Sequence, residues 1–200
     1  MFKTLGGIFI LVGLRCSLPV SLLLGLTVSI NLFPFLAWFV RAFYYLPIQL
    51  IVIGGLYLKI VPTWVMSRLP NVGKEVIIYL SVVTSIVGVV LMWNRFNLVT
   101  LLVASRVYNS QIFVLGALFY HPIIFLFIYY FTRYILIVSG QRWSLWLLSA
   151  LPPSPLFLFK INIIIILFNY NLFLSVLVFI SIILSYFTYI KFISYLLLKY

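Results

Sequence analysis

The chain has 200 residues, of which 66% are hydrophobic and 7% are charged, and its formal net charge at pH 7 is +12. Its mean hydropathy is +1.31, and a water-soluble fold of this composition would expose a very large apolar surface. The 13 basic residues are scattered singly and form no run, which argues against a nucleic-acid-binding protein. The composition therefore indicates a polytopic membrane protein.

The apolar runs are continuous and do not alternate with a period of two residues. A backbone that crosses lipid must satisfy its own hydrogen bonds, and continuous runs favour helices over the strands of a barrel. We therefore expect an all-α fold, in which residues 1–200 form a single transmembrane helical bundle with about eight spans.

Stretches of about 20 apolar residues, punctuated by proline, glycine and charge, give the order of the elements. The expected membrane segments are residues 5–31, 45–66, 76–93, 97–118, 121–139, 143–169 and 172–198. Because Pro19 stands early in the first run, we expect either one kinked helix there or a short helix that leads into a longer one. Arg15 follows the N-terminal apolar stretch, so we interpret that stretch as part of the first helix and not as a cleaved signal. The clearest loop is SRLPNVGK, at residues 67–74.

Proline interrupts two of the expected segments, near residues 29–40 and within residues 143–169. Pro34 marks the first break, and three prolines between residues 152 and 155 remove backbone donors at the second. Broken helices leave free backbone groups at membrane depth, which is tolerated where they are buried in protein or line a polar cavity. The alternative is that these prolines only kink their helices. Two breaks, each followed by a lysine, favour a transporter or a proton pump.

Lys59 and Lys160 both lie inside apolar stretches, while Glu75 is the only acidic residue of the chain. A cation within a membrane segment is costly and is commonly functional. Each lysine has the alternative of reaching the interface with its long side chain, or of pairing with a carboxylate from another chain. Eight apolar or small residues precede Lys59, and INIIIIL follows Lys160, so neither has an obvious short route to the interface. We favour a functional role for both.

Four motifs, in the same order, resemble those of one family. LFPFLAWF at residues 32–39 is similar to Ala-Pro-Phe-His-x-Trp, and LKIVP at residues 58–62 is similar to Trp-Gln-Lys-Ile-Ala-Pro. Residues 94–105 resemble Asn-Gln-x-x-Leu-x-x-Leu-Leu-Ala-Tyr-Ser-Ser, and LPPSPLFLFK at residues 151–160 resembles Leu-Pro-Pro-x-x-Gly-Phe-x-x-Lys. The family is subunit 2 of respiratory complex I, the NADH:ubiquinone oxidoreductase, an antiporter-like subunit of the membrane arm.

The resemblance implies a multi-pass protein of the mitochondrial inner membrane that takes part in proton translocation coupled to NADH:ubiquinone electron transfer. Lys59 and Lys160 match two family lysines that take up and release protons. Desolvation makes an ammonium group easier to deprotonate, which suits such a role. Enrichment in Phe, Tyr, Ile, Leu and Asn, with almost no Asp or Glu, is typical of an AT-rich organellar gene.

The chain also departs from the family pattern. A family lysine falls on Ser29, a histidine on Leu36 and an acidic residue on Arg41. Further along, a family serine falls on Arg106 and a histidine on Asn109. The family's earlier helices, which supply a partner glutamate, have no counterpart here. Either a companion chain supplies them, or the subunit keeps its structural place with an incomplete proton path.

No motif for a redox centre or a metal site is present in the sequence. There is no glycine-rich phosphate cradle and no haem-type histidine pair, and Cys16 is the only cysteine. We therefore expect this chain to carry no cofactor of its own. The expected partners are other membrane-arm subunits and a phospholipid such as cardiolipin, for which Arg106 and Arg133 are candidates. We expect Glu75 to lie at the surface with Lys74 as its partner.

Two other functions fit parts of the same pattern. One is a structural membrane scaffold of the same complex that retains only the helix packing of a pump. The other is an independent small transporter with inverted repeats, which the paired proline breaks suggest.

Overall fold

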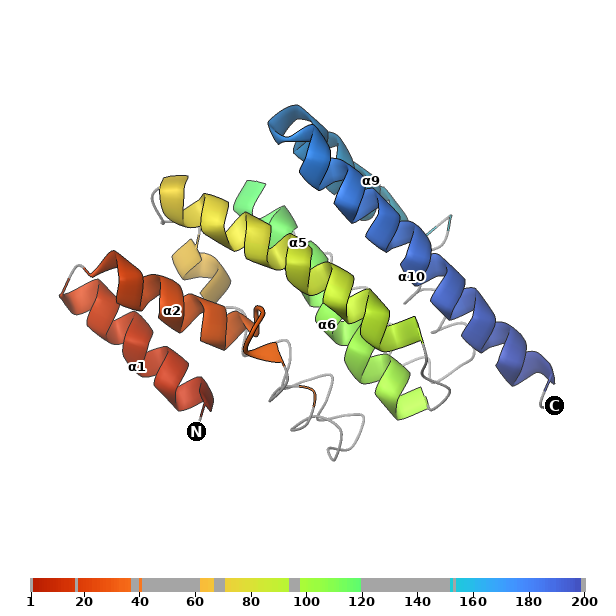
Figure 1. The fold of residues 1–200 in the computed structure, drawn as a ribbon, viewed down its shortest axis with the longest axis horizontal. Helices are drawn as coiled ribbons and strands as arrows, with labels where there is room; N and C mark the ends of the chain where they lie inside the picture. The colour runs from red at the N-terminus through yellow and green to blue at the C-terminus, as the bar shows by residue number, and fades with distance from the viewer. Residues whose placement is uncertain are drawn as a thin grey trace.

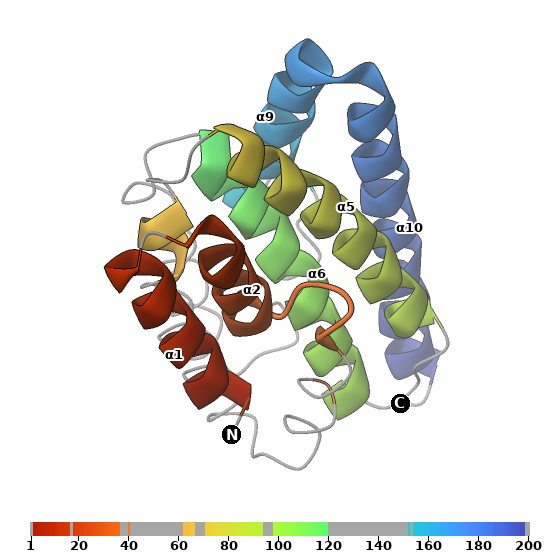
Figure 2. The ribbon, with the colours of Figure 1, turned by 60° about the vertical axis from the view of Figure 1, so that its left-hand side comes forward.

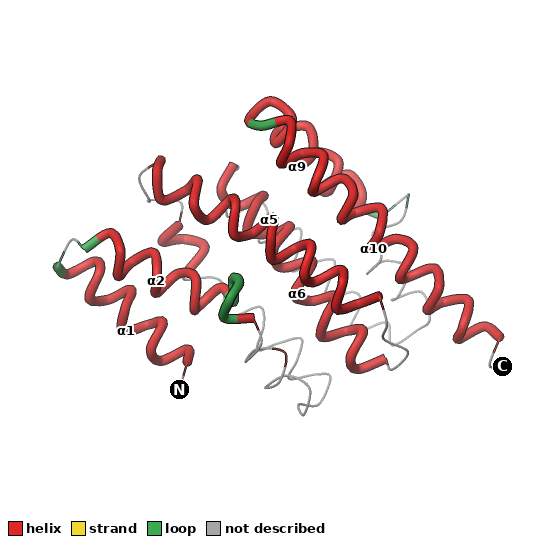
Figure 3. The backbone as a smooth tube through the Cα atoms, viewed as in Figure 1, coloured by secondary structure: helices red, strands yellow, loops and turns green. Residues whose placement is uncertain are grey.

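The computed structural model describes residues 2–16, 18–36, 40, 62–66, 71–93, 98–119, 152 and 154–198. All regular structure in these residues is helical (Figure 3). The labelled helices are α1 (Phe2–Arg15), α2 (Pro19–Ile30), α5 (Asn71–Trp93), α6 (Leu98–Phe119), α9 (Pro155–Tyr170) and α10 (Leu172–Leu198). Residues 62–66 form a further short helical piece. The all-α class is confirmed for the described residues, and the total of eight spans stays a prediction.

The helices α5 and α6 run antiparallel through the middle of the structure (Figure 1). The α9–α10 pair packs on one side of them, through contacts of α10 with α5 and of α9 with α6. The α1–α2 pair lies on the other side, where α2 contacts α5. Figure 2 shows the same order of pairs from a second direction.

Two helical stretches, Gly73–Trp93 and Leu172–Tyr195, are long and apolar enough to cross a membrane. They correspond to the expected segments at residues 76–93 and 172–198, and α6 corresponds to the segment expected at 97–118. Large apolar side chains on the outer faces stay exposed, among them Leu11 on α1 and Phe173 on α10. Such surfaces suit a lipid environment, where apolar side chains need no cover from water.

The first expected segment is a helical hairpin. The prediction of one kinked helix was wrong, whereas the alternative of two successive helices is found, although the second helix is not the longer one. The chain reverses between α1 and α2, whose 14 and 12 residues reach about 21 Å and about 18 Å. Both are shorter than the hydrocarbon core of about 30 Å. Pro19 occupies the first turn of α2, where its missing N–H has no cost, and it therefore starts a new helix instead of kinking the old one.

Glycine lets the two helices of this hairpin approach closely. A Cβ atom at Gly25 would lie 2.7 Å from the backbone nitrogen of Ile10, and one at Gly13 would lie 2.7 Å from the backbone nitrogen of Leu22. Separations this short are not compatible with a side chain. The α1–α2 contact is thus a small-residue interface of the kind common between membrane helices.

The second half of the loop expected at residues 67–74 is helical, so that part of the prediction was wrong. Asn71–Lys74 form the first turn of α5. Pro70 and Asn71 suggested a turn, but the backbone N–H groups of a first helical turn need no partner within the helix, so polar residues are tolerated there.

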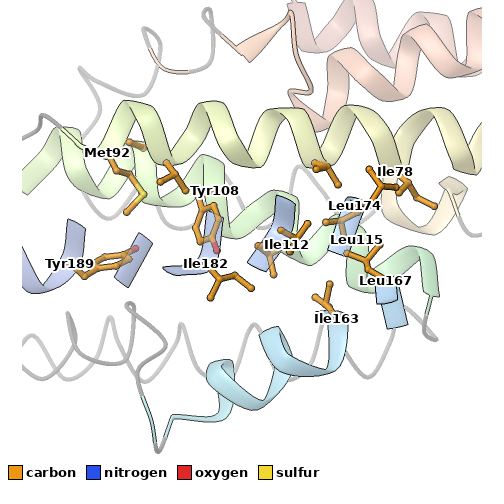
Figure 4. Packing of buried hydrophobic residues seen from close by; sticks show 14 of the residues in the cluster. Ile78, Met92, Tyr108, Ile112, Leu115, Ile163, Leu167, Leu174, Ile182 and Tyr189 are labelled. Carbon is orange, nitrogen blue, oxygen red and sulfur yellow. The ribbon is translucent and has the colours of Figure 1, made fainter. Parts of the chain in front are cut away.

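One apolar cluster joins α5, α6, α9 and α10 (Figure 4). Its fully buried members include Ile163 and Leu167 of α9 and Val178 of α10. Tyr108 of α6 and Tyr189 of α10 lie in the same cluster and bring polar groups into it. This cluster surrounds the candidate site.

Candidate functional site: a buried lysine between α6, α9 and α10

The break after α2 frees a backbone N–H group, and a neighbouring helix supplies its acceptor. Asn31 ends α2 in a left-handed conformation with φ of 63°, and its N–H donates to carbonyls in the last turn of the helix. The next free donor is the backbone N–H of Phe33, which donates to Oγ1 of Thr84 on α5 at 2.9 Å. The same hydroxyl donates to the carbonyl of Leu80. The chain is thus interrupted after α2, and a neighbouring helix accepts the backbone donor that the interruption frees. Phe33 itself is 46% exposed, and the proline-broken membrane helix predicted near residues 29–40 stays a prediction.

Two of the three positions at this break where the family has a titratable residue carry none here. Ser29 is buried, and its hydroxyl donates to the carbonyl of Leu26 at 3.0 Å, one turn earlier in the same helix. Leu36 is buried against Val103 and Val107 of α6. Arg41 lies outside the described residues. The described part of the break therefore holds no cation at the expected place.

The second proline break places a helix start just ahead of Lys160. Ser154 has an extended backbone, and Pro155 stands in the first turn of α9. Pro is well suited to that position because it has no N–H to satisfy. Residue 152 is in a turn. The C-terminal half of the predicted discontinuous element is thus a helix, while residues 143–151 lie outside the described part of the chain.

Lys160 is almost completely buried, with 2% of its surface exposed. No group in the described ranges accepts a hydrogen bond from its Nζ atom. Instead, Nζ lies 5.0 Å from the ring centroid of Tyr108 on α6 and 5.2 Å from that of Tyr186 on α10. Both distances are within the range of cation–π interactions.

The site lies at the level of the helix centres. Tyr108 is at the middle of α6 and Tyr186 is near the middle of α10. Figure 4 shows Tyr108 directed from α6 toward α10, beside Ile182. A lysine held between these two rings lies level with the centres of α6 and α10, and its burial argues against the alternative in which the side chain reaches the interface.

The only acidic side chain of the protein is far from this lysine. Glu75 is exposed just after the first turn of α5, and its carboxylate is a neighbour of Tyr170 at the end of α9. Tyr170 follows Lys160 by ten residues of the same helix, a separation of about 15 Å along its axis. The position of Glu75 at the surface is as predicted. Its expected pairing with Lys74 is not found, because adjacent helical residues do not face each other.

Two glycines set the spacing of the helices around the site. A Cβ atom at Gly88 of α5 would lie 3.1 Å from the backbone nitrogen of Tyr108. One at Gly116 of α6 would lie 2.7 Å from Cζ of Phe159, the residue before Lys160. Sequence reasoning did not identify the two tyrosines or these glycines. The sequence signal for these residues was their position in the middle of an apolar segment, where glycine permits close helix packing and tyrosine brings in a polar group.

The structure therefore places one of the two predicted site residues. Lys160 has the geometry described above. Lys59 lies outside the described residues, and its role stays a prediction. Arg106 lies on α6, in a stretch where its side chain is not described.

A helical fold with two helices of membrane-spanning length and a cation buried among its helices is consistent with a membrane protein of the helical class. No family model matches the chain. Over 183 residues it is 32% identical to NADH-ubiquinone oxidoreductase chain 2 of Albinaria caerulea. The matched region covers 84% of this chain and 58% of that relative. The chain belongs to the NADH-ubiquinone oxidoreductase chain 2 family, as its motifs predicted. It spans somewhat more than half the length of that relative.

Proposed function

We propose that the chain is a membrane-arm subunit of the proton-translocating NADH:ubiquinone oxidoreductase in the mitochondrial inner membrane. Family membership supports this assignment over an independent transporter. Its partners are then the other membrane-arm subunits of that complex. Electron transfer belongs to other parts of the complex, and this chain contributes to moving protons.

The observation that carries the proton-translocation role is the position of Lys160. A lysine level with the centres of α6 and α10, 2% exposed and without a carboxylate nearby, is costly to keep charged. Its ammonium can therefore release a proton to a neighbouring carrier and recover it again, whereas arginine could not. We assign Lys160, with Lys59, as proton carriers of this subunit.

The test is the number of protons translocated per NADH oxidised by the assembled complex. Lys160→Met removes the titratable group but keeps an unbranched apolar side chain. We expect the ratio to fall in this variant. Lys191→Met is the matched control, because Lys191 is exposed on α10, and we expect no change there. An unchanged ratio in Lys160→Met contradicts the assignment.

A structural scaffold is the second candidate, and Ser29 and Leu36 favour it. At the positions where the family has a lysine and a histidine, this chain has Ser29, which is hydrogen-bonded within its own helix, and the buried Leu36. A proton path through these two positions would be interrupted. In that case Lys160→Met leaves the proton ratio unchanged and alters only the amount of assembled complex. The same experiment thus separates the two candidates.

A further inference from the structure

The charge of Lys160 has no anionic partner in the described part of the chain. Glu75 faces Tyr170 near the far end of α9. The hydroxyls of Ser181 and Ser185, the α10 side chains beside Tyr108, donate to carbonyls of their own helix at 2.7 Å. These hydroxyls are neutral and already hydrogen-bonded within α10, so they supply no negative charge to Lys160. Within the described ranges, the groups placed at cation–π distance from the ammonium are the rings of Tyr108 and Tyr186.

Two rings from different helices lie within cation–π distance of the same Nζ atom. Tyr108 comes from α6 at 5.0 Å, and Tyr186 comes from α10 at 5.2 Å. The face of an aromatic ring carries negative potential, and its attraction for a cation is strongest where water is excluded. Lys160 is 2% exposed and Tyr108 is completely buried, so water does not screen the interaction.

We propose that Tyr108 and Tyr186 form an aromatic cage that replaces a carboxylate counter-charge and stabilises the ammonium form of Lys160. Both tyrosines are positioning residues, which act on the proton carrier and do not exchange protons themselves. The inference deepens the proposed function of Lys160, but the geometry of the cage does not depend on whether protons are pumped.

An aromatic cage also has a chemical advantage over an ion pair at this place. A carboxylate beside Lys160 would hold the ammonium strongly charged and would itself need desolvation. Rings attract the cation more weakly and stay neutral when the proton leaves. The lysine therefore alternates between its two forms without leaving a second charge buried.

The test is a double-mutant cycle in the assembled complex, with the amount of assembled complex in the membrane as the readout. Tyr108→Leu removes the ring, and Tyr108→Phe keeps it and removes only the hydroxyl. We expect Tyr108→Leu to lower the assembled amount several-fold, because an unstabilised buried charge destabilises the subunit. We expect Tyr108→Phe to assemble like the parent protein.

The decisive variants combine each change with Lys160→Met. Once the cation is gone, removing the ring costs only packing, so Tyr108→Leu should lower assembly much less in the Lys160→Met background. Tyr186→Leu should show the same coupling to Lys160.

An equal loss in both backgrounds, including complete failure to assemble in both, means that Tyr108 serves packing alone and overturns the cage. A loss in Tyr108→Phe as large as that in Tyr108→Leu also overturns it. The proton ratio of Lys160→Met is measured separately, so the cage and the proton-carrier role can fail independently.

Discussion

The backbone N–H of Phe33 donates a hydrogen bond to Oγ1 of Thr84 at 2.9 Å, which joins the break after α2 to the middle of α5. A broken helix at membrane depth leaves donors that lipid cannot satisfy. Here the hydroxyl of a packed helix supplies the acceptor. This contact, and not the break alone, holds the first interruption in place.

Replacing Thr84 by Val should destabilise the protein by about 1–3 kcal/mol, because the Phe33 donor then loses its acceptor in a part-buried place that lipid cannot satisfy. Thr84→Ser keeps the hydroxyl and should recover most of the loss. Ser85→Ala is the control, since the Ser85 hydroxyl donates only to the carbonyl of Val82 in its own helix. Thermal inactivation of the solubilised complex ranks the stabilities of these three variants. Equal stability of the Val and Ser variants would contradict the role of this hydrogen bond.

Asn31 requires a left-handed backbone, with φ of 63°. Glycine adopts this conformation without strain, whereas alanine pays roughly 1–2 kcal/mol. We expect Asn31→Gly to be more stable than Asn31→Ala by about 1–2 kcal/mol. At most other positions glycine is the less stabilising residue, because it loses more conformational entropy on folding. Melting of the complex containing each variant is the comparison, and an alanine variant that melts at or above the glycine variant speaks against the described backbone.

The hairpin of α1 and α2 depends on the absence of a side chain at Gly25. An alanine there would place its Cβ 2.7 Å from the backbone nitrogen of Ile10, so the helices must separate. We expect Gly25→Ala to cost about 1–3 kcal/mol.

Gly7 provides the matched control for this prediction. It lies on α1, and a Cβ atom there meets nothing within 4 Å. Gly7→Ala should stabilise the helix by up to about 1 kcal/mol. If the two alanine variants shift the melting temperature in the same direction, the close packing of the hairpin is wrong.

The spacing of α5 and α6 at the site should depend on Gly88 in the same manner. A Cβ atom at this position meets backbone atoms of Tyr108 at 3.1 and 3.2 Å, which cannot rotate away. We expect Gly88→Ala to displace Tyr108 relative to Lys160 and to lower the proton ratio more than it lowers assembly. Val90→Ala is the control, because Val90 is 65% exposed on the same helix. A Gly88 variant that pumps normally would show that this spacing is not needed.

Much of the fold could be predicted because membrane helices are recognisable from the length and composition of their apolar runs. The apolar runs that became α6 and α10 needed only counting. The reversal between α1 and α2 was missed because Pro19 is equally consistent with a kink and with a helix start, and tertiary packing through Gly13 and Gly25 decides between them.

The site was predictable only in part, for a related reason. Lys160 stands out in the sequence, because a cation among isoleucines is costly. Tyr108 and Tyr186 do not stand out among 14 tyrosines, and only the packing of three helices shows that both rings face one lysine. Likewise, the neighbours of Glu75 depend on where α9 ends, which no local pattern specifies.

The central claim is that Lys160 exchanges protons, and Lys160→Arg tests it most directly because arginine keeps the positive charge but does not release its proton. The measurement is the number of protons translocated per NADH oxidised by the assembled complex carrying this variant. We predict a ratio below that of the parent protein and close to that of Lys160→Met. A ratio equal to that of the parent protein would show that a fixed charge is sufficient at this position, and it would contradict the account.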